Sequence, residues 1–115
     1  MEYDLEILSD IFDLFLEELK FFSSDFEVQY QRFQRSDITE DLANEFGDIE
    51  KERGRILLEN GWLTEEQYDI ILEIDKKLDS MSTNKNLWDN DALEHSEEWK
   101  SCKKMGLELL ASLGY

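Results

Sequence analysis

Leu5–Phe22 of the chain reads LEILSDIFDLFLEELKFF, and its apolar residues recur at alternating spacings of three and four. This spacing places them along one side of an α-helix. One row comprises Leu5, Leu8, Phe12, Phe15, Leu19 and Phe22, and a neighbouring row comprises Ile7, Ile11 and Leu14. Together the rows exceed the apolar stripe of roughly 100° that an ordinary surface helix buries. We therefore expect the central helix of a bundle, with both rows covered by other helices and an acidic edge left for solvent.

Capping signals predict two further helices after this one. Ser24 and Glu27 have the spacing of a capping box and start a helix of about three turns that ends near Arg35. Asp37 or Thr39 is the expected N-cap of a third helix, which runs to about residue 60. The predicted inner line of this third helix is Leu42, Phe46, Ile49, Arg53, Ile56 and Leu57.

Two glycines interrupt the third predicted helix. Gly47 and Gly54 are seven residues apart and therefore share a helix face. Each costs up to about 1 kcal/mol relative to alanine inside a helix. One explanation is close packing of another helix against this face, and the other is a kink or break near Gly47. The sequence leaves both open.

The clearest boundary in the chain follows the third helix. Asn60-Gly61 ends it, because glycine adopts the left-handed conformation without a steric penalty. Thr64 and Gln67 then form a capping box that starts a fourth helix reaching about Met81. The predicted buried residues of this helix are Tyr68, Ile71, Leu72, Leu78 and Met81, with Ile70 and Ile74 beside them.

The last third of the chain contains one more long helix. Leu87-Trp88 is expected to anchor a polar loop on the core, and Asp91–His95 to form a single helical turn. Ser96 caps a closing helix that extends through Leu113. With no strand pattern anywhere and short connections throughout, we predict an all-α fold, in which residues 1–115 form a single-domain antiparallel bundle of about five helices.

Composition restricts the class of protein. Hydrophobic residues make up 41% and aromatic residues 12% of the 115 positions, too many for a disordered acidic tail. No apolar run reaches the roughly 18 residues that span a membrane. The first residues, MEYDLE, are acidic, unlike the basic start of a signal peptide. Cys102 is the only cysteine, so no internal disulfide can form. These observations predict a soluble, cytoplasmic protein.

Negative charge dominates the chain and is unevenly distributed. Twenty-nine acidic and twelve basic residues give a net charge of −17. Residues 1–52 carry sixteen acidic and four basic residues, a net charge of −12, whereas residues 53–115 carry a net charge of −5. Such a field repels nucleic acids and anionic membranes and attracts basic partners. Solubility alone is the simpler explanation, since net charge bears on association and not on fold.

A carboxylate stripe on the third predicted helix is the candidate interaction surface. Asp41, Glu45, Asp48 and Glu52 follow one another at spacings of four, three and four, and like charges so placed destabilise an isolated helix. The stripe is either a solvated face or a patch kept for a cationic partner. The predicted partner-binding residues are Asp37, Glu40, Asp41, Glu45, Asp48 and Glu52, with Asp10, Asp13 and Glu17 of the first helix as a minor wall.

Catalytic and cofactor motifs are absent from the sequence. His95 is the only histidine, which excludes zinc motifs with two histidines, and Asp75 is the one acid that interrupts a predicted inner line. Cys102 lies on the buried line of the closing helix, where a thiol is unreactive. There is no phosphate-binding glycine loop, no nucleophile elbow and no basic stripe for nucleic acid. We predict no enzyme activity, no cofactor, no metal and no direct nucleic-acid binding.

The tail of the chain carries a family resemblance. Residues 87–99 read LWDNDALEHSEEW and precede the closing helix. With the length, the acidic first half and the single helical domain, this tail resembles the small acidic immunity proteins of bacterial contact-dependent growth inhibition and related polymorphic-toxin systems. The resemblance implies a cytoplasmic protein that binds a cognate toxin domain, often a nuclease with a basic cleft, and neutralises it. It transfers no individual binding residue.

Two other hypotheses remain open at this stage. The first is a phage-type acidic nucleic-acid mimic that inhibits a host restriction or defence enzyme, because such proteins are also small, acidic and helical. The second is a carboxylate-bridged metalloenzyme, which would require several acids to face the interior of the bundle. Neither has a motif of its own in the sequence.

Overall fold

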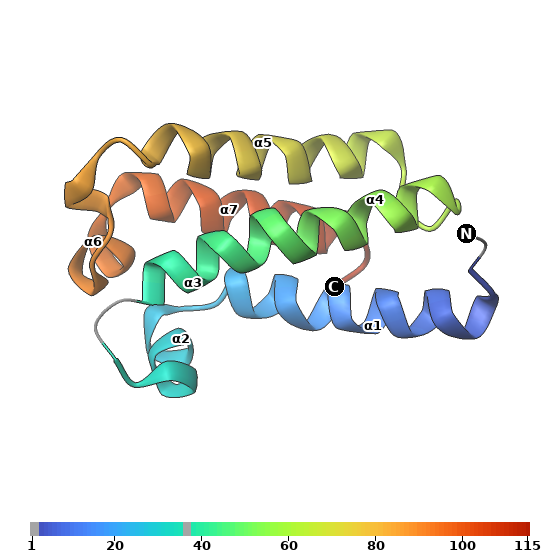
Figure 1. The fold of residues 1–115 in the computed structure, drawn as a ribbon, viewed down its shortest axis with the longest axis horizontal. Coiled ribbons are helices and arrows are strands. Elements are labelled where there is room, and N and C mark those ends of the chain that lie inside the picture. Colours follow the sequence, from blue (N-terminus) through green and yellow to red (C-terminus); the bar gives the residue numbers. More distant parts are fainter. Residues whose placement is uncertain (1–2, 36–37) are drawn as a thin grey trace.

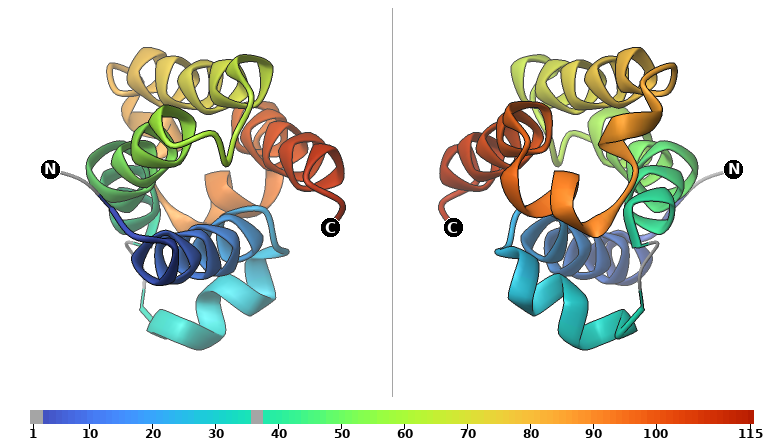
Figure 2. Two further views of the ribbon diagram at one scale, coloured as in Figure 1. Left: turned by 90° about the vertical axis from the view of Figure 1, so that its right-hand side faces the viewer. Right: turned by 90° about the vertical axis from the view of Figure 1, so that its left-hand side faces the viewer.

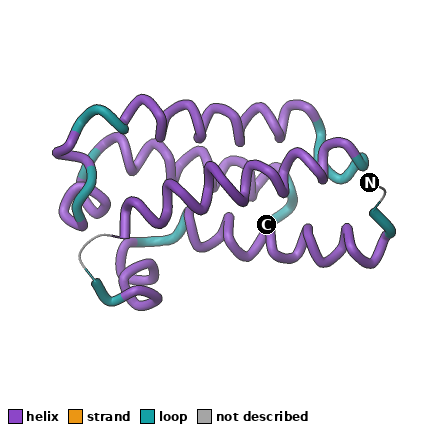
Figure 3. Tube along the Cα trace, in the orientation of Figure 1, coloured by secondary structure: helices purple, strands orange, loops and turns teal. Residues whose placement is uncertain are grey.

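The computed structural model describes residues 3–35 and 38–115. Its elements are α1 (Leu5–Phe22), α2 (Phe26–Phe33), α3 (Ile38–Glu45), the π-helical turn η1 (Phe46–Glu50), α4 (Lys51–Glu59), α5 (Glu65–Met81), the 3₁₀ turn η2 (Lys85–Leu87), α6 (Asn90–His95) and α7 (Glu97–Ser112). No strand occurs in these two ranges (Figure 3). The prediction of an all-α bundle is therefore confirmed.

Four long segments form the bundle, and successive segments run in opposite directions (Figure 1). They are α1, the continuous run α3–η1–α4, α5 and α7. Each packs against two others, in the cyclic order α1, α4, α5, α7 (Figure 2). The short helices α2 and α6 both lie at the same end of the bundle. The molecule measures 42 × 26 × 26 Å, and no helix in the described ranges has the length and apolar character to cross a membrane.

The first apolar row of α1 forms much of the core. Phe15 and Leu19 are fully buried, and Phe22 is 4% exposed. The second row is less deeply covered than its sequence predicts, because Ile7 and Leu14 are 45% and 46% exposed. The expectation that neighbouring helices cover both rows is therefore wrong for these two positions and for Leu5 of the first row, which is 76% exposed. The acidic edge of α1 faces solvent as predicted.

The start of α2 differs from the predicted capping box. Asp25, not Ser24, is the N-cap residue, and the Ser24 hydroxyl donates a hydrogen bond to the Phe21 carbonyl at 2.6 Å. The helix ends at Phe33, where Gln34 adopts a left-handed conformation with φ of 51°. The buried residue of this helix is Gln29, whose amide donates to the last carbonyls of α1. Residue 29 thus joins α2 to the end of α1.

The N-cap prediction for α3 is settled only in part. Asp37 lies outside the described residues. Thr39 is the second residue of the helix, is fully buried and has no hydrogen-bond partner for its hydroxyl among the described residues. Thr39 is therefore not the cap.

The π turn η1 resolves the question raised by the two glycines. At Gly54 a Cβ atom would lie 2.6 Å from Ile71 Cδ1, so α5 packs closely there. At Gly47 the helix neither stays regular nor breaks, because η1 accommodates one extra residue within a continuous rod. The extra residue rotates the following side chains by about 100°. Ile49 is consequently 42% exposed, against prediction, and Glu50 is buried in its place at 1%.

The corner between α4 and α5 agrees with its sequence prediction. Gly61 has φ of 80°, and the Trp62 amide donates to the Leu57 carbonyl at 2.8 Å, as expected for a glycine-terminated helix. The Thr64 and Gln67 capping box is complete, with both hydrogen bonds present. One prediction fails on the following helix, where Leu72 is 41% exposed.

Tryptophans fasten the closing segment to the core. The Trp88 indole donates to the Met81 carbonyl at 2.9 Å, and the Trp99 indole donates to the Leu87 carbonyl at 2.7 Å. Trp99 is 1% exposed, and Ser96 caps α7 as predicted by accepting from its amide. These contacts hold α6 and the start of α7 at the same end of the bundle as α2.

Candidate functional site

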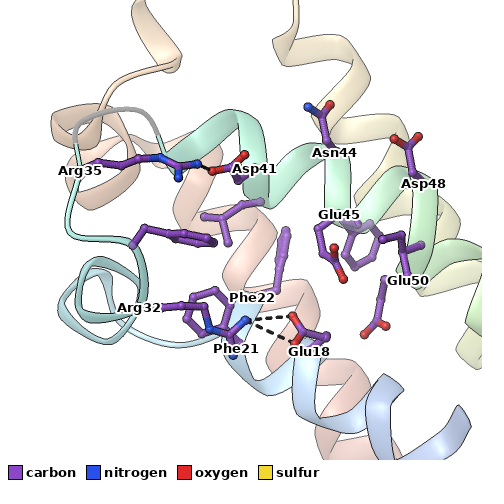
Figure 4. Close-up of a pocket in the computed structure, with 14 residues that line it drawn as sticks. Glu18, Phe21, Phe22, Arg32, Arg35, Asp41, Asn44, Glu45, Asp48 and Glu50 are labelled. Carbon is purple, nitrogen blue, oxygen red and sulfur yellow. Dashed lines mark hydrogen bonds and ion pairs between the residues drawn. The ribbon is translucent and has the colours of Figure 1, made fainter.

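A pocket opens between α1, α2 and the α3–η1 segment, with a volume of about 520 Å³ (Figure 4). Its lining combines carboxylates, two arginines, one amide and apolar side chains. The lining residues are Glu18, Phe21, Phe22, Arg32, Phe33, Arg35, Asp41, Leu42, Asn44, Glu45, Phe46, Asp48, Ile49 and Glu50. The volume falls in the range of about 300–1,000 Å³ typical of ligand pockets.

Aromatic rings form the apolar wall of the pocket. The Phe22 and Phe46 centroids are 4.8 Å apart, which joins α1 to η1. The Phe21 and Phe33 rings meet edge to face at 6.0 Å, which joins α1 to α2. Pairs of this kind stabilise by about 0.5–1.5 kcal/mol beyond the area they bury. These ring pairs therefore stabilise the contacts of α1 with η1 and with α2, which form the apolar wall.

Two arginines occupy part of the acidic rim. The Arg32 guanidinium lies 3.5 Å from the centre of the Phe21 ring and 3.2 Å from a carboxylate oxygen of Glu18. Arg35 forms an ion pair with Asp41. The lining contains five carboxyl groups and only these two cations. Acidic groups thus remain in excess.

Glu50 is the most deeply buried acid of the pocket. Its side chain is 2% exposed, and one carboxyl oxygen lies 3.4 Å from Nη1 of Arg53. The other oxygen has no hydrogen-bond partner among the described residues. Burial raises the pKa of Glu50 to about 9. The Arg53 guanidinium opposes this pKa rise, whereas the carboxylates of Glu18 and Glu45 add to it.

Figure 4 displays how the acids converge. The Glu45 and Glu50 carboxyl groups both point from the α3–η1 segment toward α1, where Glu18 faces them. Arg53 approaches from α4 and also lies 3.7 Å from Glu45. At neutral pH a pKa near 9 leaves Glu50 protonated, so a neutral acid lies among charged ones.

The structure brings together only part of the predicted carboxylate stripe. Asp41, Glu45 and Asp48 line the pocket, but Glu52 lies beyond it and accepts from Nε of Arg55 at 3.0 Å. The stripe is not continuous, since η1 rotates the helix between its halves. Arg35, Arg53 and Arg55 neutralise three of its four members. Asp48 is exposed and has no ion pair within the described ranges.

The remaining predicted residues lie away from the pocket. Glu40 is exposed and borders a shallower surface depression near Trp88, and Asp37 lies outside the described residues. The predicted α1 residues Asp10, Asp13 and Glu17 are exposed but do not line the pocket. Their neighbour Glu18 does. The sequence pattern did not assign Glu18 or Glu50 to the site. Glu50 could have been placed on the inner face only if the extra residue in η1 had been recognised.

The other candidate groups give no second site. Cys102 is fully buried, as predicted, and burial raises the pKa of its thiol to about 11. His95 is exposed beside Glu94. Within the described part of the chain, no group of three or more histidine, cysteine, aspartate or glutamate side chains is arranged to hold a metal ion.

Comparisons with protein-family models, curated proteins and solved structures found no match for this chain. The function must therefore be inferred from the pocket, its charge and the surrounding surface.

Proposed function

We propose that this protein is an immunity protein that binds a cognate toxin domain with a basic surface, a nuclease, and neutralises it. The observation that carries the proposal is the excess of carboxyl groups around the pocket between α1, α2 and α3–η1, on a chain with a net charge of −17. Nuclease clefts are basic because they bind phosphates. An acidic protein can occupy such a cleft by presenting charges where the substrate would.

Electrostatic attraction suits a protein that must capture its target quickly. Complementary charge raises association rate constants to about 10⁸–10⁹ M⁻¹s⁻¹ at low salt, and this gain falls as salt screens it. Charges at the rim act mainly on the association rate. Asp48 is the exposed acid of the pocket that forms no ion pair within the described ranges and interacts with Lys51 only at longer range, so its charge is neutralised less directly than those of Glu18, Asp41 and Glu45.

Charge reversal at the pocket and away from it tests the proposal. Asp48→Lys and Glu66→Lys each change the net charge by two, but Asp48 lines the pocket whereas Glu66 is exposed on α5. The natural binding candidate is the product of the gene adjacent to the one encoding this chain. Stopped-flow association with that protein should slow at least tenfold for Asp48→Lys and much less for Glu66→Lys at low salt. The salt dependence should flatten only for Asp48→Lys.

Three results would contradict the proposal. The adjacent gene product could lack a toxin domain, or it could fail to bind at low salt. Equal effects of the two reversals would remove the pocket face from the interface. Inhibition of several unrelated DNA-binding enzymes would instead favour a general nucleic-acid mimic over a dedicated immunity protein.

A further inference from the structure

The unpaired oxygen of Glu50 suggests what the pocket binds. Buried polar atoms are nearly always hydrogen-bonded, because an unpaired one costs about 1–3 kcal/mol. Glu50 lines the pocket with a side chain that is 2% exposed and one oxygen that has no partner among the described residues. A donor that enters the pocket would satisfy this oxygen.

The walls beside Glu50 favour a flat cation over a compact one. Phenylalanine rings line the pocket near the acids: Phe22 and Phe46 are only 4% and 2% exposed, and Phe33 is half-buried. A guanidinium group stacks on aromatic rings and donates paired hydrogen bonds to a carboxylate, whereas an ammonium group is smaller and more strongly hydrated. The chain already uses this chemistry at the rim, where Arg32 stacks on Phe21 and pairs with Glu18.

We propose that the pocket receives the guanidinium group of an arginine side chain from the partner protein, with Glu50 and Glu45 as its acceptors. The proposal rests on the proposed function, which supplies a basic partner. Arginine is among the residues that most often anchor protein interfaces, and such anchors occupy desolvated pockets. The inferred site lies deeper than the rim charges, so it contributes to the lifetime of the complex more than to its rate of formation.

Binding of a cation should displace the Glu50 proton. The charged groups that face this carboxyl are Arg53 from α4, Glu18 from α1 and Glu45 from α3. Burial keeps the pKa of Glu50 near 9 in the free protein. A guanidinium partner stabilises the ionised form, so arginine binding releases a proton and tightens as pH rises toward 9. One released proton corresponds to at most about a tenfold change in Kd per pH unit.

A capped amino acid tests the pocket without the toxin. Nα-acetyl-arginine amide is the probe, and Nα-acetyl-citrulline amide, which is neutral and nearly isosteric, is the matched control. Amide chemical shifts are recorded for the full chain during each titration. We expect the arginine probe to shift the amides of residues 45–50 saturably, with a Kd in the millimolar range that falls from pH 6 to pH 8. The citrulline probe should produce no saturable shift.

Variants distinguish binding of the probe in the pocket from attraction by the overall negative charge of the protein. Glu50→Gln should weaken probe binding at least fivefold and remove its pH dependence, and Glu45→Gln should weaken it in part. Glu108→Gln, an exposed change on α7 outside the pocket, should leave Kd unchanged. The inference is overturned if citrulline binds as well as arginine, if Glu50→Gln binds like the parent protein, or if the arginine probe does not saturate.

A second arm distinguishes failure of this inference from failure of the proposed function. Dissociation of the adjacent gene product from the parent protein and from Glu50→Gln is measured by surface plasmon resonance. We expect the Glu50→Gln complex to dissociate at least tenfold faster. Equal dissociation rates would overturn the arginine site while leaving the immunity function in place. If that gene product does not bind at all, the proposed function fails, and the probe titration alone decides whether the pocket is a guanidinium site.

Discussion

Ser23 and Gly106 meet where the end of α1 crosses α7, and a Cβ atom added at residue 106 would lie 2.0 Å from the Ser23 hydroxyl oxygen. Gly106→Ala should therefore push the two helices apart and lower the free energy of unfolding by about 1–3 kcal/mol. Gly54→Ala is the comparison and should cost less, because its Cβ would lie 2.6 Å from the terminal Ile71 Cδ1 and at an ordinary 3.6 Å from the Tyr68 ring. Urea denaturation provides the measurement.

A second substitution makes this prediction specific. Ser23→Ala removes the atom that blocks the new methyl group, and the Ser23 hydroxyl has no hydrogen-bond partner among the described residues. The double variant Ser23→Ala/Gly106→Ala should be more stable than Gly106→Ala alone. Purely additive effects would mean that the hydroxyl does not cause the clash.

The buried carboxyl of Glu50 should make stability depend on pH. Its pKa is about 9 in the folded protein, against an ordinary value of 4.5 when unfolded. Between these two pKa values the folded state therefore retains a proton that the unfolded state loses. The contribution of Glu50 to the free energy of unfolding is complete below pH 4.5 and decreases as pH rises to 9. The loss is about 1.4 kcal/mol per pH unit for one proton. Glu50→Gln should remove it, so the variant gains stability relative to the parent from pH 5.5 to pH 8.5.

The control for this titration is Glu108→Gln, which neutralises an exposed carboxyl on α7. Its denaturation midpoints should follow those of the parent protein across the same pH range. A Glu50→Gln variant whose stability difference from the parent does not change with pH would contradict the raised pKa.

The register shift at η1 predicts unequal costs for two alanine substitutions. Leu42 is 5% exposed, so Leu42→Ala should cost about 2–5 kcal/mol in unfolding free energy. Ile49 is 42% exposed, so Ile49→Ala should cost less than about 1 kcal/mol. A regular α-helix through this segment would bury both residues and make the costs similar. Thermal and urea unfolding of the two variants distinguishes these cases.

Cys102 should resist modification until the protein unfolds. Its thiol is fully buried on α7, so a reagent cannot reach it, and its pKa is raised to about 11, so the reactive thiolate is not formed near neutral pH. A colourimetric thiol reagent should react slowly with the native protein at pH 8 and immediately in denaturant. Rapid reaction of the native protein would show that this part of the core opens.

The capping box of α5 should contribute measurable stability. Thr64 accepts from the Gln67 amide at 3.1 Å, so Thr64→Ala should lower the free energy of unfolding by about 1 kcal/mol. Thr83→Ala, an exposed change in the loop after α5, is the matched control and should have almost no effect. Equal stability of the two variants would mean that the cap is not formed in solution.

Local signals predicted the helices well because caps and periodicity are encoded within a few residues. The Thr64 box and the Gly61 corner are of this kind, and the structure contains both. The Ser24 box failed because the Ser24 hydroxyl donates to the Phe21 carbonyl three residues back, and Asp25 takes the N-cap position. The pocket could be predicted only in part, since Asp41, Glu45 and Asp48 belong to one local stripe.

The remaining site residues depend on information that periodicity does not contain. Glu50 faces inward because η1 holds one extra residue, and a 3.6-residue repeat assigns that place to Ile49. Glu18 belongs to the pocket because α2 folds back beside α1, which allows Arg32 to reach it. Both are consequences of how segments distant in sequence pack together.

The π turn also bears on how the chain can change length. Deleting one residue between 46 and 50 would restore a continuous α-helical hydrogen-bonding pattern without altering the order or direction of the four long segments. With Ile49 removed, Glu50 would inherit the inward place that a regular helix gives to residue 49. This short segment is therefore where the bundle can lose a residue while keeping its core, and its length sets the shape of the pocket rim.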